Sequence, residues 1–256
     1  ADAGYRVVVP TLRGFGGTFN ELGHRAISAL SEDDQETIYR ELFSPDELNF
    51  RVNRSAVGAN DFAASWYSYD ETPGDYALEH FSVERDEDHV IPFIRQAQRY
   101  QDDMVLHCSP WSPPTWMKNP PTYNFGTLVM TQENLDAYAQ YFVRFVQAYA
   151  ERGITVSQVH VQNEVFADQK FPSCVWTSEQ LRIFVRDHLG PAFEAAGLTA
   201  KIFLGTLNGP EDMKFTATGQ ALTNYARFVD NILFDDEARK HIAGIGYQWA
   251  GQHAVA

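Results

Sequence analysis

Cysteine, basic side chains and long apolar runs are what this chain of 256 residues has least of. Its 2 cysteines, Cys108 and Cys174, are too few for a disulfide framework, and no metal-ligand spacing surrounds them. We therefore expect buried free thiols and no metal site. No apolar run approaches the ~20 residues of a membrane-spanning helix, so we expect no membrane span. The first residues, ADAGYRVVVP, also lack a signal-peptide pattern.

Positive charge is scarce as well. The 20 Lys and Arg residues against 34 Asp and Glu give a net charge of −14. A protein of this sign repels phosphate backbones, which argues against nucleic acid as a partner and fits a solvated acidic surface. With 44% hydrophobic residues the chain can bury a full core, and we expect a single domain over residues 1–256.

Short apolar runs alternate with amphipathic stretches along the chain. The runs that we expect to form strands are Gly14–Thr18, Asn49–Ala56, Met104–His107, Val156–Gln162, Lys201–Leu207 and Ile242–Trp249. The helices expected between them span 31–43, 86–100 with an interruption at Pro92, 134–152 ending at Gly153, 177–190 and 225–233. Thr177 and Gln180 form a capping box, and Gly190-Pro191 is expected to close that helix.

Alternating strands and helices at this spacing predict parallel βα units. The expected strands could form a doubly wound sheet or an incomplete (β/α)8 TIM barrel, and periodicity does not separate these α/β folds. Polar, aromatic and carboxylate residues gather where the strands end, which is the face on which barrel enzymes build their sites. We therefore favour the incomplete barrel, with about six βα units.

The strongest chemical signal is the run that ends in Asn163-Glu164, at the end of an expected strand. A carboxylic acid can protonate a leaving oxygen, and an amide beside it can donate to and accept from sugar hydroxyls. Taken alone, such a pair is more often part of a loop or helix cap.

Two other segments carry polar and aromatic residues just after strands. The loop after His107, as far as Lys118, contains three prolines and two tryptophans, of which Trp111 offers a rigid face for a pyranose ring, with packing in the core as the alternative. Arg54 lies within an apolar strand and needs a partner, for which a carboxylate is the obvious candidate. Asp61 and Phe62 follow that strand, and Asp61 could accept hydrogen bonds from substrate hydroxyls.

Together these segments resemble glycoside hydrolase family 30, the family of glucosylceramidases and related β-glycosidases. Nearly the whole chain takes part in the resemblance. The matching segments are Gly14-Phe15-Gly16-Gly17, Arg54 with Asp61-Phe62, the run from Ser109 to Lys118, Gln162-Asn163-Glu164 and His188-Leu189-Gly190-Pro191.

The resemblance implies a role for each matching residue. Glu164 is implied to be the general acid/base, Asn163 to bind the sugar 2-hydroxyl, and Arg54 to orient the nucleophile. The implied substrate-binding residues are Asp61, Phe62, Trp111 and Trp249. It further implies retention by double displacement, with two carboxyl groups about 5–5.5 Å apart and no metal or organic cofactor. A secreted or periplasmic location is favoured over a cytoplasmic one.

The chain departs from the family pattern at two places. The sixth-strand motif usually reads Gly-Ile-x-x-His-Trp-Tyr, whereas this chain has Gln248 and Ala250 in place of the imidazole and the phenol. The resemblance implies a β-glucoside as substrate, with a β-1,6-glucan or a β-xyloside as alternatives, and the altered sixth strand argues against assuming the ceramide substrate. The nucleophile is expected on a seventh strand beyond residue 256, so we predict that residues 1–256 alone are inactive. The alternative from another class is a non-catalytic carbohydrate-binding protein.

Overall fold

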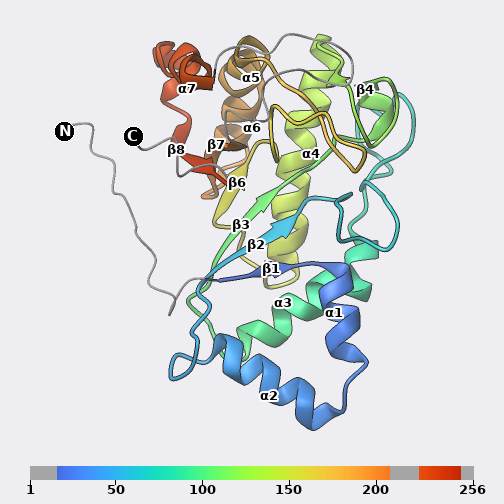
Figure 1. The fold of residues 1–256 in the computed structure, drawn as a ribbon. Helices are drawn as coiled ribbons and strands as arrows, with labels where there is room; N and C mark the ends of the chain where they lie inside the picture. The colour runs from blue at the N-terminus through green and yellow to red at the C-terminus, as the bar shows by residue number, and fades with distance from the viewer. Residues whose placement is uncertain (1–15, 208–224, 249–256) are drawn as a thin grey trace, which may run out of the picture.

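The computed structural model describes residues 16–207 and 225–248 (Figure 1). Its main element is a 6-stranded sheet with the order β1-β2-β3-β6-β7-β8, and all of its neighbouring strands are parallel. The strands of this sheet are β1 (Thr18–Phe19), β2 (Val52–Ala56), β3 (Val105–Ser109), β6 (Gln158–His160), β7 (Lys201–Leu207) and β8 (Ile242–Tyr247). Strands that follow one another in this sheet are also neighbours in space, without the reversal of order that defines a doubly wound sheet. The expected barrel arrangement is therefore the one observed.

The strands begin and end close to the expected positions. The predicted range of β7 is confirmed, β3 runs two residues further than expected, and β6 is shorter than expected. The first expected strand lies partly outside the described residues, and the strand that is described there is Thr18–Phe19. A small antiparallel pair, β4 (Lys118–Asn119) and β5 (Thr127–Leu128), belongs to the loop after β3.

Helices fill the connections and follow the order of the sheet. Figure 1 shows α1, α2 and α3 gathered near β1, and α5, α6 and α7 gathered near β7 and β8. The α-helices are α1 (Glu21–Ser28), α2 (Glu32–Phe43), α3 (Val90–Gln98), α4 (Gln132–Glu151), α5 (Ser178–Ile183), α6 (Gly190–Ala195), α7 (Tyr225–Leu233) and α8 (Asp236–Arg239). The shorter helical turns are η1 (Glu84–Asp88), η2 (Thr115–Met117) and the π-helical η3 (Phe184–Leu189).

Local capping signals correctly located two helix starts. The Ser31 side chain accepts from the Asp34 backbone N–H at the start of α2. At α5 the predicted capping box is complete, because Thr177 Oγ1 accepts from Gln180 N at 3.1 Å and Gln180 Oε1 accepts from Thr177 N at 2.9 Å. Such caps satisfy N–H groups that have no partner within the helix.

The prediction that Gly190-Pro191 ends the helix was wrong. The helix does not close there but continues from α5 through η3 into α6. The Gly190 N–H donates to the Val185 carbonyl, five residues back, which is a π-helical bond. This wider turn accommodates a proline, whose ring collides with the carbonyl four residues earlier in a regular α-helix. The interruption expected at Pro92 lies three residues earlier: η1 and α3 separate at His89, and Pro92 lies in the first turn of α3, where a proline is tolerated.

The core lies between the sheet and α4. The face of α4 that packs inward is aromatic and fully buried, with Tyr138, Phe142, Phe145 and Tyr149 among its members. Both cysteines are free and buried, as expected, and burial raises the pKa of the Cys174 thiol to about 11. No helix in the described parts of the chain is long and apolar enough to cross a membrane.

Candidate active site

Five of the parallel strands deliver polar side chains to one end of the sheet. Because all strands point the same way, residues at their carboxyl ends meet at a common edge. Arg54 comes from β2, Ser109 from the end of β3, Thr206 from β7 and Gln248 from the position after β8. Asn163 and Glu164 follow β6 and lie between these strands. The structure therefore brings together the three residues that sequence reasoning named as catalytic.

The backbone fixes Glu164 in an uncommon conformation. Its φ of 50° lies in the left-handed region, which non-glycine residues rarely occupy. Its N–H donates to the Thr206 carbonyl at 2.8 Å, while the N–H of Asn163 donates to the Pro110 carbonyl at 2.8 Å on the opposite side. Strained backbone of this kind persists where the surroundings over-determine it, often at functional sites.

The buried side chain of Gln162 holds this turn in place. Its Nε2 donates to the Trp111 carbonyl and to the Asn163 carbonyl, both at 2.8 Å, and its Oε1 accepts from Trp176 Nε1 at 3.2 Å. One amide thus ties the loop after β3 to the Asn163-Glu164 turn. Its role was not foreseen beyond its place in the family motif.

Among the described residues, Arg54 is hydrogen-bonded to uncharged oxygens, and no carboxylate there pairs with it directly, contrary to what the sequence had led us to expect. Its Nη2 donates to Ser109 Oγ at 2.7 Å and to Asn163 Oδ1 at 2.6 Å. Its Nη1 donates to Gln248 Oε1 at 3.0 Å. Hydroxyl and amide oxygens can satisfy a guanidinium because its five N–H donors form a planar fork that meets several strands at once.

Carboxylates act on Arg54 through space. Burial lowers the pKa of the Arg54 guanidinium to about 10, while the negative charges of Glu164 and Asp61 oppose that shift. Arg54 therefore stays protonated at neutral pH, and its positive charge stabilises the ionised form of a nearby carboxyl group.

The Asn163 amide has a defined orientation. Its Oδ1 accepts from Arg54 and also from Thr206 Oγ1 at 3.2 Å, which leaves its NH2 group as the donor toward a ligand. A donor beside a candidate acid is the arrangement that binding of a sugar hydroxyl requires.

Trp111 is more deeply packed than a free sugar platform. Only 6% of its surface is exposed, and the Arg54 guanidinium lies 4.3 Å from the centre of its ring. A cation over an indole face is attracted by the ring quadrupole, so Trp111 helps to hold Arg54. Trp116 is half-buried, and its Nε1 donates to the Asp70 carbonyl at 3.0 Å.

Asp61 and Phe62 lie in a turn outside the network around Arg54. Asn60 builds the turn, since its Nδ2 donates to the Gly58 carbonyl and its Oδ1 accepts from Phe62 N at 2.8 Å. Asp61 is exposed, and 51% of the surface of Phe62 is exposed. Trp249, the remaining expected substrate-binding residue, lies outside the described residues.

Three residues of the network were missed by sequence reasoning as functional: Ser109, Thr206 and Gln248. Each is a polar residue at or just after the end of an apolar strand, which is the signal that could have found them. Gln248 was noted only as a departure from the family pattern. Within residues 16–207 and 225–248, no group of three or more His, Cys, Asp or Glu side chains is arranged to hold a metal ion.

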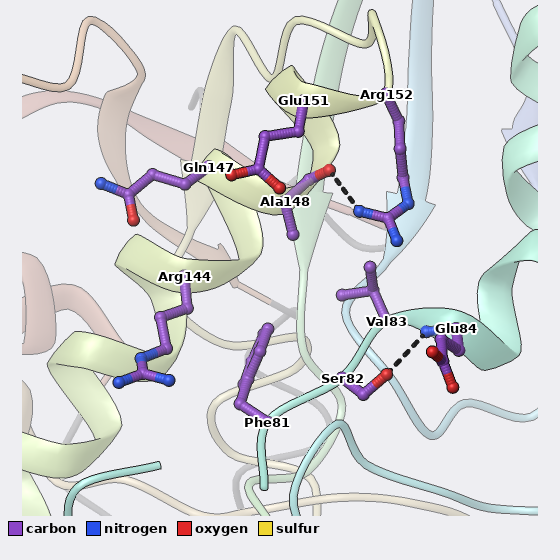
Figure 2. Close-up of a pocket in the computed structure, with 9 residues that line it drawn as sticks. All are labelled: Phe81, Ser82, Val83, Glu84, Arg144, Gln147, Ala148, Glu151 and Arg152. Atoms are coloured by element: carbon purple, nitrogen blue, oxygen red, sulfur yellow. Dashed lines mark hydrogen bonds between the residues drawn. The ribbon is translucent and has the colours of Figure 1, made fainter. Parts of the chain in front are cut away.

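A hollow of about 490 Å³ lies away from this network (Figure 2). It is formed by the segment Phe81–Glu84, by the second half of α4, which contributes Arg144, and by Arg152 just after that helix. The end of α4 precedes β6, so this hollow lies toward the amino ends of the strands, opposite to Glu164. None of the expected site residues lines it.

Comparison with known proteins places this arrangement in a family. The chain matches the glycosyl hydrolase family 30 TIM-barrel domain over residues 12–254. It is 30% identical over 247 residues to the lysosomal acid glucosylceramidase of Mus musculus, and 29% identical over 243 residues to putative glucosylceramidase 2 of Caenorhabditis elegans. These matches cover 93% and 92% of this chain but 45% of each relative, so the chain spans about half the length of the curated relatives it matches.

Solved structures give the same result. SrfJ from Salmonella typhimurium superposes with a TM-score of 0.82 and 27% identity, over 94% of this chain and 52% of that one. The endo-β-1,6-glucanase BT3312 superposes with a TM-score of 0.81 and 26% identity, over 93% and 52%. The expected TIM barrel is confirmed, with the six described strands forming part of it. The chain belongs to glycosyl hydrolase family 30.

Proposed function

We propose that this chain is part of a retaining β-glycosidase in which Glu164 is the general acid/base. The observation that carries the proposal is the position of Glu164 at the carboxyl end of β6, beside Asn163 and opposite a buried Arg54. A carboxyl group fixed by its backbone next to a sugar-binding amide is what protonation of a glycosidic oxygen requires. The similarity to glucosylceramidases supports a β-glucoside as substrate.

The proposed reaction has two steps. Glu164 protonates the departing glycosidic oxygen while a carboxylate attacks the anomeric carbon from the other side, forming a covalent glycosyl-enzyme. Glu164, now ionised, then removes a proton from the water that releases the sugar with retained configuration. We place the attacking glutamate beyond residue 256, on the next strand of the barrel, about 5–5.5 Å from Glu164 as retention requires.

The roles proposed for the remaining residues follow the family pattern. Asn163 donates to the 2-hydroxyl through its NH2 group, and Arg54 orients the nucleophile. Asp61 and Trp111 hold the non-reducing sugar, while Phe62 and Trp249 contribute apolar surface to the carbohydrate. The chemistry uses carboxyl groups alone, so the proposal includes no metal or organic cofactor.

A second candidate from the same class is endo-β-1,6-glucanase. It is favoured by the superposition on BT3312, an endo-β-1,6-glucanase, with a TM-score of 0.81. The superposition on SrfJ has a similar TM-score of 0.82. The two candidates differ in their products. A β-glucosidase releases glucose from aryl β-glucosides, whereas an endo-glucanase produces oligosaccharides from β-1,6-glucan.

Glu164→Gln in the full-length protein tests the acid/base role. We expect hydrolysis of β-glucosides with poor leaving groups to fall by about 10²–10⁴-fold, because the amide cannot donate the proton. Substrates with very acidic leaving groups are affected less in the first step, and added azide restores turnover because it attacks the intermediate without base assistance. The measurement is kcat/KM on a panel of aryl β-glycosides and β-linked glucans, with product analysis.

A matched control is Glu41→Gln, an exposed carboxylate on α2 whose side chain is 57% exposed. It should behave like the wild type. Unchanged hydrolysis of poor-leaving-group substrates by Glu164→Gln rejects the acid/base role. A wild-type full-length protein that binds these carbohydrates without cleaving any of them supports the carbohydrate-binding alternative instead.

A further inference from the structure

Gln248 bridges the two charged residues at the centre of the site. It follows β8, and its backbone N–H donates to the Leu207 carbonyl at 2.9 Å. Its side-chain Nε2 donates to Glu164 Oε1 at 2.6 Å, and its Oε1 accepts from Arg54 Nη1 at 3.0 Å. Thr206 Oγ1 lies 3.0 Å from the same Oε1. A single amide therefore connects β2, β7 and the turn after β6.

Arg54 determines which way this amide points. A guanidinium can only donate hydrogen bonds, so the group that faces it must be the amide oxygen. With the opposite orientation, the Gln248 NH2 would face the Arg54 N–H groups and its oxygen would face a carboxylate. The network thus assigns the NH2 group to Glu164.

This contact distinguishes the two oxygens of Glu164. A carboxylic acid has one carbonyl oxygen, which accepts, and one hydroxyl oxygen, which carries the proton. Because Gln248 donates to Oε1, this oxygen is the accepting one in the acid form of Glu164. The same contact persists when Glu164 is ionised, since the amide does not titrate. An imidazole at this position would change its own charge near pH 6.5.

We propose that Gln248 is the positioning residue for Glu164: it donates to Oε1 in both protonation states and so fixes the orientation in which the carboxyl group exchanges its proton with substrate and water. This proposal rests on the acid/base role proposed above. If the proposal is correct, Gln248 influences the pH at which the Glu164 carboxyl group titrates, although Gln248 itself carries no charge.

Four other ionisable groups near the site, all among the described residues, have pKa values outside the range in which activity is measured. Arg54 on β2 remains protonated, with a pKa of about 10. His107 on β3 and His160 on β6 remain neutral because burial lowers their pKa values to about 4 and about 2. The Tyr247 phenol beside Gln248 also stays neutral, because burial raises its pKa. Asp61 shares the field of Arg54 and is unchanged in the test variants.

The test uses Gln248→Ala and Gln248→Glu in the full-length protein. Removing a donor to a carboxylate raises the pKa of that carboxyl group, and a second carboxylate beside it raises the pKa further. The free energy of a hydrogen bond to a charged group is equivalent to a pKa change of about one unit or more. We expect the Glu164 carboxyl titration to shift upward by about one unit in Gln248→Ala and further in Gln248→Glu. The titration is followed by infrared difference spectroscopy against Glu164→Gln, which requires no turnover.

The kinetic readout is the pH dependence of kcat/KM. The alkaline limb, which reports the loss of the proton from the acid, should move to higher pH in Gln248→Ala and further in Gln248→Glu. At the optimum, kcat should fall on an alkyl β-glucoside with little change in KM, and be nearly unchanged on a dinitrophenyl β-glucoside, whose leaving group needs no proton. The matched control is Gln98→Ala, a hydrogen-bonding glutamine at the end of α3 that donates to the Gly153 carbonyl at 3.2 Å. It should leave both readouts unchanged.

The outcomes separate this proposal from the proposed function. A Glu164 titration that stays in place in both Gln248 variants overturns the positioning role, even if the protein is an active glycosidase. If the Gln248 variants shift the Glu164 titration but the wild-type protein hydrolyses no glycoside, the contact is supported and the proposed function is rejected. Because Gln248→Glu keeps the size and shape of the side chain, it supplies the answer if Gln248→Ala does not fold.

Discussion

Trp111 is packed against Arg54 in addition to the sugar contact that we propose for it. Its ring is 6% exposed and lies 4.3 Å from the Arg54 guanidinium, so removing it uncovers a buried cation as well as apolar surface. We expect Trp111→Ala to lower the free energy of unfolding by about 3–5 kcal/mol, as for a core tryptophan, and also to weaken binding of a sugar-like inhibitor. Chemical unfolding and calorimetric titration of the full-length protein measure the two effects.

Trp66→Ala is the matched control, because 42% of the Trp66 surface is exposed. It should change stability far less. If Trp111→Ala weakens inhibitor binding without lowering stability, the indole acts as a sugar platform alone and its contact with Arg54 contributes little to folding.

At the scale of elements, β3 and β6 carry two histidines that pack together, His160 buried and His107 partly buried. The rings of His107 and His160 lie 4.8 Å apart, and His160 stacks on Phe203 at 4.9 Å with an interplanar angle of 2°. The Nδ1 atoms of both histidines are buried, and neither has a hydrogen-bond partner in the part of the chain that the structure describes. Burial lowers the pKa of His160 to about 2, with His107 and Arg54 as further causes.

This pair predicts a loss of stability in acid. A histidine whose pKa is lowered by folding binds fewer protons in the native state than in the unfolded state below pH 6.5, so stability falls as pH falls. One such histidine that stays neutral down to pH 4 costs the native state about 3 kcal/mol there. We expect His160→Phe, which keeps the ring stacking, to flatten the dependence of unfolding free energy on pH between 6.5 and 4.

His80→Asn is the control with the opposite sign. His80 is exposed, and its hydrogen bond to Asp75 raises its pKa, so its contribution is present at low pH and lost as pH rises. Replacing it should not flatten the acid limb. A His160→Phe variant with the wild-type slope would mean that the histidines of β3 and β6 are not held neutral.

At the scale of the whole molecule, the sheet of the described residues has two edges. β3 has partners on both sides, whereas β8 pairs only with β7. Unpaired edge strands expose N–H and C=O groups that can template pairing with other chains. We expect the 256-residue polypeptide to show faster backbone amide exchange in β8 than in β3, to associate in sedimentation experiments and to lack glycosidase activity.

Hydrogen exchange, sedimentation and turnover assays of that polypeptide, beside the full-length protein, test this expectation. The full-length protein is the control, in which further barrel strands should protect β8. A monodisperse 256-residue polypeptide that protects β8 as well as β3 and hydrolyses β-glucosides would contradict both the barrel arrangement and the position of the nucleophile.

The sequence by itself determined the features that depend on near neighbours. The caps at Ser31 and Thr177 act over three residues, and the alternation of apolar runs with amphipathic stretches repeats within each βα unit. Short-range hydrogen bonds and side-chain periodicity are legible without knowledge of the rest of the fold. The family motif likewise drew attention to Glu164 and Asn163 as candidates, because each signature is contiguous in the chain. The rule that Gly-Pro ends a helix gave the wrong helix end at Gly190-Pro191, because the chain forms a wider π-helical turn there.

Only the tertiary structure decided how the site is connected. Arg54 reaches Ser109, Asn163 and Gln248 across 55, 109 and 194 residues, and Gln248 reaches Glu164 across 84. These contacts depend on strand order and register, which place the carboxyl ends of distant strands together. Sequence patterns therefore indicated that buried Arg54 needs a partner, but the uncharged oxygens that it meets among the described residues followed from which side chains the sheet brings within hydrogen-bonding distance.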